Sequence, residues 1–103
     1  MEMVEIRKTL NFSQWLDGLR DLRARARVQV RIERLASGHA GDVKPVGAGV
    51  SELRIDYGPG YRVYFTRRGT TLVILLAGGV KRGQPADIRL ALRLARKLED
   101  GAL

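Results

Sequence analysis

Arginine and lysine are the residues of this sequence best suited to act on a substrate. They number 19 against 11 aspartates and glutamates, which gives a formal net charge of +8 at pH 7, and only four of the 19 are lysines. A guanidinium pairs with phosphate in a bidentate way and stacks on nucleobases. This balance therefore indicates a polyanion, either a nucleic acid or the ribosome, as the binding partner. A charged surface that serves solubility alone, or an arginine-rich codon usage, is the alternative explanation.

Other kinds of catalytic chemistry find little support in the composition. The absence of cysteine excludes disulfides, thiolate zinc sites and cysteine nucleophiles. His39 is the one histidine, so a histidine metal site lacks its ligands, and the acids are too scattered for a two-metal nuclease. The turn at residues 58–60 lacks the spacing of a nucleotide-binding loop. We therefore expect neither a metal nor a cofactor.

Two arginines fall where neighbouring strands would bring them together. Residues 51–57 and 61–66 alternate as strands do, which places apolar side chains toward the helices and Arg54 and Arg62 on the other face. Like charges on paired strands repel unless an anion or a carboxylate lies between them. A phosphate-binding concavity is one interpretation, with Arg62 exposed, so that Arg62→Ala would remove activity and leave the fold intact. The other interpretation is a structural ion pair with the acids of the same face, Glu52 and Asp56.

Further cations lie outside these two strands. Lys81 and Arg82 follow an apolar strand, residues 70–77, and would emerge beside the start of the last helix. Lys44 belongs to residues 38–49, which hold four glycines and a proline and are therefore expected to form a loop. We expect Lys44, Lys81 and Arg82 to form a cluster of cations with almost no general base among them.

Residues 21–36 admit two secondary-structure interpretations. Residues 26–32 alternate as a strand would, yet an apolar stripe at helical spacing also runs through Ala24, Val28, Ile32 and Leu35. The length of the segment and its flanking helix formers favour a helix. Its polar side is then either a solvated face or a track for phosphates, formed by Arg20, Arg23, Arg27, Arg31 and Arg34.

The pattern of expected helices and strands predicts a single α+β domain over residues 1–103, in which helices cover an antiparallel sheet. Asn11 or Ser13 would cap the first helix, and Trp15 is expected in the core. Short turns on both sides of the second hairpin strand make antiparallel pairs, and the apolar third strand suits a central position. The predicted order is strand 3–10, helices 12–19 and 21–36, strands 51–57, 61–66 and 70–77, and helix 85–98.

The hydropathy pattern indicates a cytoplasmic protein. No apolar stretch approaches the ~20 residues that span a bilayer. The first residues lack the basic-then-apolar order of a signal peptide. We therefore expect no membrane partner.

Three segments carry a resemblance to a known family. Residues 52–55, ELRI, and residues 58–65, GPGYRVYF, resemble the RelE/ParE toxin superfamily, in its phage-derived addiction module killer (HigB-like) branch. Residues 75–81, LLAGGVK, resemble it independently and lead through Gln84, Asp87 and Ile88 into the final helix. The resemblance covers nearly the whole chain in order.

The resemblance implies the RelE-like fold and the toxin of a type II toxin–antitoxin system. Such a toxin cleaves mRNA on the ribosome without metal and is neutralised by a helix-turn-helix (HigA-like) antitoxin. The attacking group is the RNA's own 2′-hydroxyl, and cations stabilise the phosphate. Arg62 would hold the scissile phosphate, Arg54 would assist the nucleophile, and Lys81 and Arg82 would lie near the leaving group. Contacts to RNA or ribosome are expected from Lys44, Arg23, Arg27, Arg31 and Tyr64.

Three positions depart from the family pattern, and two other functions remain open. Glu52 stands where a second basic residue is expected, and it would act as an acid or base or would pair with Arg54. Val80 replaces a usual aspartate, and Ile88 falls where RelE has a tyrosine. The alternatives are a ParE-like inhibitor of DNA gyrase and a basic binding module without activity.

Overall fold

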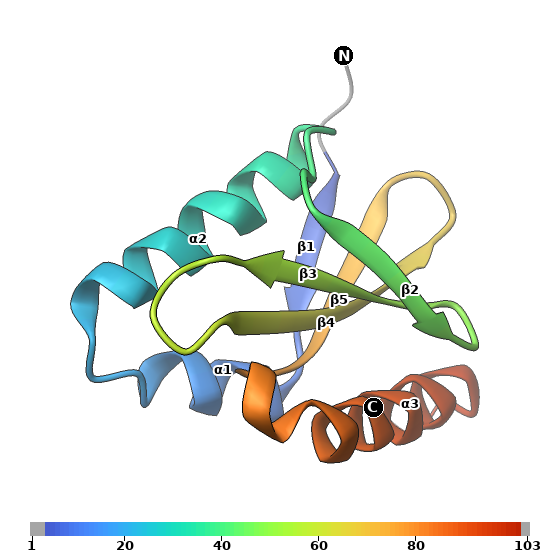
Figure 1. Cartoon of the computed structure of the whole chain (residues 1–103). Helices are drawn as coiled ribbons and strands as arrows, with labels where there is room; N and C mark the ends of the chain where they lie inside the picture. The colour runs from blue at the N-terminus through green and yellow to red at the C-terminus, as the bar shows by residue number, and fades with distance from the viewer. Residues whose placement is uncertain (1–3, 102–103) are drawn as a thin grey trace.

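The chain folds into a five-stranded sheet with helices on both faces (Figure 1). The computed structural model describes residues 4–101. The strands are β1 (Glu5–Lys8), β2 (Val43–Gly47), β3 (Val50–Ile55), β4 (Tyr61–Arg68) and β5 (Leu72–Val80). The helices are α1 (Leu10–Asp17), α2 (Leu22–Ala36) and α3 (Gln84–Glu99), with a 3-10 turn, η1 (Lys81–Gly83), before α3.

The strands lie in the order β1-β5-β4-β3-β2. The pair β1–β5 is parallel and the other three pairs are antiparallel. The apolar strand β5 has a neighbour on each side, as its composition predicted. The α+β class is confirmed, with a mixed sheet instead of a wholly antiparallel one.

The segment expected to be a loop contains the edge strand β2, so that expectation is wrong over Val43–Gly47. An edge strand tolerates a residue without an N–H donor, which explains Pro45 there, and a bulge follows between Pro45 and Gly47. Gly47, Ala48 and Gly49 have φ of 113°, 50° and 78° and turn the chain into β3. The glycines and the proline therefore belong to a hairpin.

Two apolar cores lie on opposite faces of the sheet. α1 and α2 pack against Leu53 and Val63, the face that alternation predicted for helices. α3 packs on the other face, against Tyr64 and Leu76 (Figure 1). The face of Arg62 is therefore covered along part of its length by α3.

The two N-terminal helices begin at capping side chains. The Oγ1 of Thr9 accepts a hydrogen bond of 3.1 Å from the amide three residues on, so Thr9 caps α1. The expected caps, Asn11 and Ser13, lie inside the helix. Asp21 caps α2 in the same way, and the helical interpretation of residues 21–36 is confirmed, with its apolar stripe buried.

Two adjacent glycines of β5 let a helix approach each side of the sheet. A Cβ on Gly78 would overlap the indole of Trp15, which packs against the core as predicted. A Cβ on Gly79 would overlap the carboxylate of Asp87. Because Gly79 is the register partner of Arg62, the first turns of α3 lie close to that arginine.

The helix α3 extends the predicted helix by one residue at each end. Pro85 lies in its first turn, where the missing N–H costs nothing. Ala91, Leu94 and Ala95 are buried against the sheet, and the arginines of the opposite side are exposed. Among residues 4–101 no helix is both long and apolar enough to cross a membrane.

Candidate functional site

A polar hollow of about 340 Å³ opens beside the turn that joins β3 to β4. Arg54, Arg62 and Lys81 line it, so the structure brings together three of the four predicted catalytic residues. Its remaining lining consists of two carboxylates and the turn itself, namely Asp42, Asp56, Gly58, Pro59 and Gly60.

Arg54 and Arg62 face each other as register partners on β3 and β4, as predicted. Each arginine has its own carboxylate. Arg54 Nη2 lies 3.1 Å from Asp42 Oδ1, and its Nε donates to the same carboxylate at 3.2 Å. The hydrogen bond with Asp42 raises the pKa of Arg54. Asp42 comes from the segment before β2, and its pairing with Arg54 was not predicted from the sequence.

Arg62 is buried, which contradicts the expectation of an exposed strand arginine: only 8% of the residue is accessible. Its Nη1 donates to the Tyr61 carbonyl at 3.2 Å, and its Nε lies 3.7 Å from Glu52 Oε1. The ion pair that was predicted for this face therefore forms between Glu52 and Arg62. α3 packs on this face of the sheet, where its Asp87 lies against Gly79, the register partner of Arg62.

Glu52 is fully buried beneath the hollow. Its Oε2 accepts a hydrogen bond of 2.6 Å from Gln84 Nε2, at the first residue of α3. Three buried side-chain polar atoms have no hydrogen-bond partner in the described part of the chain: Glu52 Oε1, Arg62 Nε and the Tyr64 hydroxyl. Burial, followed by the charges of Glu52 and Asp87, raises the pKa of Tyr64. Burial also raises the pKa of Asp87.

The β3–β4 turn is tied to the end of β5. The Lys81 amide donates to the Gly60 carbonyl at 2.7 Å. Gly60 has φ of +81°, and a Cβ there would lie 3.3 Å from Lys81 Cβ and 3.5 Å from Arg62 Nη1. A side chain at position 60 would therefore be strained and would crowd both cations.

Other predicted site residues lie outside this hollow. Arg82 is exposed on η1 beyond its lining, and Lys44 is exposed on β2 as the register partner of Glu52. Tyr64 is fully buried between the sheet and α3, so its ring is not at the surface where an RNA contact was expected.

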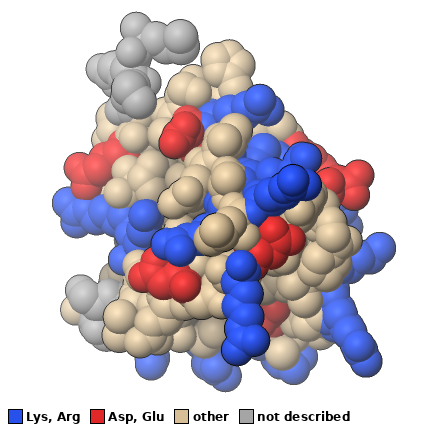
Figure 2. All heavy atoms as spheres, turned by 90° about the vertical axis from the view of Figure 1, so that its left-hand side faces the viewer, with Lys and Arg blue, Asp and Glu red and all other residues tan. Residues whose placement is uncertain are grey.

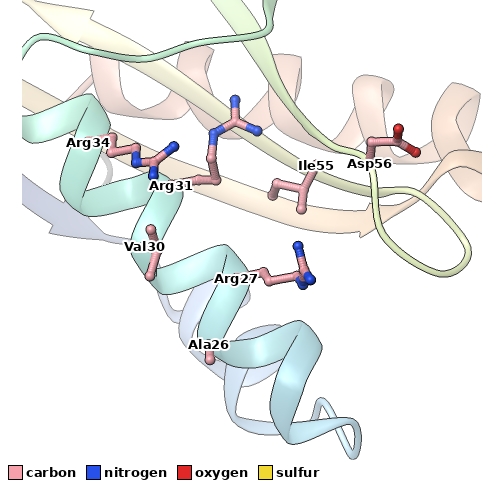
Figure 3. A pocket seen from close by; sticks show the side chains of 7 residues that line it. All are labelled: Ala26, Arg27, Val30, Arg31, Arg34, Ile55 and Asp56. Carbon is pink, nitrogen blue, oxygen red and sulfur yellow. The ribbon is translucent and has the colours of Figure 1, made fainter.

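A second hollow, of about 390 Å³, lies between α2 and the end of β3 (Figure 3). Arg27, Arg31 and Arg34 of the helix line it together with Ala26, Val30 and Ile55, and Asp56 lines both hollows. Arg31 Nη1 donates to the Arg54 carbonyl at 2.7 Å, and desolvation lowers the pKa of Arg31. Arg31 therefore fastens α2 to the strand that carries Arg54.

Arg27 and Arg23 are the other arginines of α2 that were predicted to contact RNA or the ribosome. The guanidinium of Arg27 lies over the Tyr57 ring, 4.6 Å from its centroid. Arg23 is exposed and lines neither hollow.

On the face that holds the β3–β4 turn, lysines and arginines alternate with acidic side chains (Figure 2). Positive charge is thus set in separate clusters there.

Carboxylates do not gather into a metal site in the part of the chain that the structure describes. Within residues 4–101 no group of three or more His, Asp or Glu side chains is placed to hold a metal ion. His39 is exposed. The chemistry available in the hollow beside the β3–β4 turn is therefore that of two guanidiniums, one ammonium and two carboxylates.

Comparison with known proteins places the whole site inside a matched region. A family model described as "Phage derived protein Gp49-like (DUF891)" matches residues 14–98. An uncharacterized protein of Haemophilus influenzae is 50% identical over 95 residues, which cover 92% of this chain and 96% of that protein. Every residue that lines the hollow falls within the match. The chain belongs to the family of phage-derived Gp49-like proteins.

Proposed function

We propose that this protein is the toxin of a type II toxin–antitoxin system and cleaves mRNA on the ribosome without a metal ion. The observation that carries the proposal is the hollow lined by Arg54, Arg62 and Lys81, which gathers three cations at the end of a rigid sheet. The resemblance of residues 52–55, 58–65 and 75–81 to the HigB-like branch of the RelE/ParE superfamily supports it.

The proposed reaction is an internal transesterification of RNA. The 2′-hydroxyl oxygen attacks the adjacent phosphorus, an O2′–P bond forms and the P–O5′ bond breaks. The products are a 2′,3′-cyclic phosphate and a 5′-hydroxyl. The 2′-hydroxyl proton leaves as the bond forms, and the departing O5′ takes up a proton. Cations aimed at the phosphate oxygens stabilise the charge that develops there.

The side chains of the hollow suit this reaction. Arg62 is fixed by its strand and by its Nη1 bond to Tyr61, so it suits the role of holding the scissile phosphate. Arg54, opposite it, assists the nucleophile, and Asp56 supplies a carboxylate in the same hollow to accept the proton. Lys81 stands near the leaving oxygen.

Contacts beyond the scissile phosphate are assigned to the exposed cations around the hollow. Lys44, Arg23 and Arg82 are exposed and suit the RNA backbone or ribosomal RNA. Arg27 and Arg31 border the second hollow next door. Since each phosphate contact releases counterions, binding to ribosomes weakens steeply with salt. A protein that acts on translating ribosomes works in the cytoplasm.

The proposal includes a protein partner that restrains the toxin. A helix-turn-helix (HigA-like) antitoxin encoded next to it would cover the basic hollows. Co-expression with that neighbour is expected to restore growth, and the two proteins are expected to purify together. A gene with no such neighbour would count against this part of the proposal.

Primer extension on a defined mRNA, with and without ribosomes, tests the nuclease. Wild-type protein is expected to cut only with ribosomes, and Arg62→Lys, which keeps the charge but loses the bidentate fork, is expected to cut about 100-fold more slowly. Arg93→Lys, on the exposed side of α3, is the matched control and is expected to cut at the wild-type rate.

An absence of cuts with ribosomes would contradict the nuclease. A gyrase supercoiling assay then tests the ParE-like alternative. If gyrase is also unaffected, the chain is a basic binding module without activity of its own.

A further inference from the structure

A polar cluster centred on the fully buried Glu52 lies next to Arg62 and has no part in the proposed reaction. It consists of Glu52, Gln84 and the Tyr64 hydroxyl, and it touches the hollow through Arg62. We propose that Glu52 is a positioning residue, which holds the guanidinium of Arg62 toward the scissile phosphate and exchanges no proton with RNA. This inference rests on the proposed nuclease function.

Burial separates Glu52 from the substrate. None of its surface is accessible, and it does not line the hollow. Arg62, with a side chain that is 10% exposed, lines the hollow and lies next to the carboxylate. A phosphate that enters the hollow therefore meets Arg62, and Glu52 acts on it only through that arginine.

The contacts of Arg62 show which edge of the guanidinium remains for a ligand. Its Nε side faces Glu52 Oε1 at 3.7 Å, and Nη1 donates one hydrogen to the Tyr61 carbonyl at 3.2 Å. Within residues 4–101 no hydrogen bond engages Nη2. The edge formed by Nη1 and Nη2 is thus the one available for a bidentate grip on phosphate.

Gln84 holds the Glu52 carboxylate in place beside Arg62. Its Nε2 donates to Glu52 Oε2 at 2.6 Å, which leaves Oε1 on the side of Arg62. Burial and the neighbouring carboxylates raise the pKa of Tyr64, so that hydroxyl stays protonated beside Glu52. Glu52 Oε1 and Arg62 Nε are both buried without a hydrogen bond, and a small movement of the guanidinium would join them.

The negative charge of Glu52 has two opposite effects on an anionic substrate. It weakens the attraction between Arg62 and phosphate in the ground state, and it holds the guanidinium in the orientation that the transition state needs. Glu52→Gln is therefore expected to lower kcat about 10- to 100-fold. KM is expected to stay the same or to fall.

Single-turnover cleavage of ribosome-bound mRNA over a range of protein concentrations is the test, because the rate constant at saturation reports the chemical step and the half-saturating concentration reports binding. Glu52→Gln is compared with Glu33→Gln, which makes the same change on an exposed part of α2. Gln84→Ala leaves the carboxylate charge in place and removes its tether, so a smaller loss of rate is expected. The Arg62 Nε–H signal in a ¹⁵N NMR spectrum is expected to shift or broaden in Glu52→Gln and to stay unchanged in Glu33→Gln.

The outcomes separate the inference from the function on which it rests. Wild-type protein that never cuts with ribosomes overturns the nuclease, and the positioning role falls with it. Wild-type cutting together with unchanged rates in Glu52→Gln and Gln84→Ala overturns the positioning role alone. A raised KM with an unchanged kcat also overturns it. If Glu52→Gln does not fold, the rate of Gln84→Ala decides.

Discussion

Replacing Arg62 with alanine is expected to destabilise the fold by about 3–5 kcal/mol, because the change leaves a buried carboxylate without its cation. Glu52 is fully buried and the Arg62 side chain is only 10% exposed. A domain of this size has a free energy of unfolding of about 5–15 kcal/mol, so the change removes a large share of it. Glu52→Gln alone is expected to cost less, since Arg62 still reaches solvent through the hollow.

Urea and thermal unfolding followed by circular dichroism measure the effect. At about 4–8 °C per kcal/mol, Arg62→Ala is expected to lower Tm by at least about 12 °C. The double variant with Glu52→Gln is expected to recover most of the loss, because the buried charge is then gone. Arg93→Ala, an exposed control, is expected to stay within about 0.5 kcal/mol of wild type. An Arg62→Ala variant within about 1 kcal/mol of wild type would show that Glu52 does not depend on Arg62 for its charge balance in the folded state.

Four further changes test other parts of the structure. Gly79→Ala is expected to lower stability by about 1–3 kcal/mol, since its methyl group meets the Asp87 carboxylate; an unchanged Tm would show that α3 does not pack there. Burial raises the pKa of Asp87, so the folded state binds more protons than the unfolded chain above about pH 4 and wild-type stability falls as pH rises through that window. Asp87→Asn removes this loss, so unfolding curves from about pH 3 to pH 6 are expected to favour the variant increasingly, and a constant difference would contradict the burial. Tyr64→Phe is expected to leave Tm unchanged or raise it, because its buried hydroxyl has no partner in the described structure; a loss above about 1 kcal/mol would mean that the hydroxyl is bonded. Asp42→Asn is expected to leave Tm close to the wild-type value, because its pair with Arg54 is exposed, and to strengthen binding of single-stranded RNA in a filter assay; weaker binding would contradict the idea that Asp42 competes with phosphate.

The alternation of apolar and polar residues was sufficient to predict which face Arg54 and Arg62 share. Side-chain direction in a strand follows from position alone, and short turns fix the register of a hairpin. The apolar stripe of residues 21–36 likewise predicted α2. These properties depend on neighbours in sequence, which is why they could be read directly.

The burial of Arg62 and Tyr64 could not be predicted from the residues next to them in the sequence. Both depend on where α3 packs, and α3 lies about twenty residues further along the chain. The pair of adjacent glycines on β5 is the local signal that was available, since Gly79 makes room for the carboxylate of Asp87. These glycines indicate a close approach, but the side chain that fills the space cannot be identified from the sequence.

The strand β2 and the carboxylate before it were missed for a related reason. Glycine and proline normally indicate a loop, and a short edge strand between them carries little apolar alternation. Once β2 pairs with β3, Asp42 lies beside Arg54 and balances its charge. The pairing of Asp42 with Arg54 thus depends on the β2–β3 hairpin, which the composition of residues 38–49 did not predict.

The chemical groups at the cut ends of mRNA distinguish internal transesterification from hydrolysis by water. Purified protein is incubated with programmed ribosomes and a defined mRNA, and both new termini are identified. Wild-type protein is expected to leave a 2′,3′-cyclic phosphate on one fragment and a 5′-hydroxyl on the other, and Arg62→Lys is expected to leave neither at equal times. A 3′-hydroxyl with a 5′-phosphate, or an mRNA that stays intact, would contradict the proposed reaction.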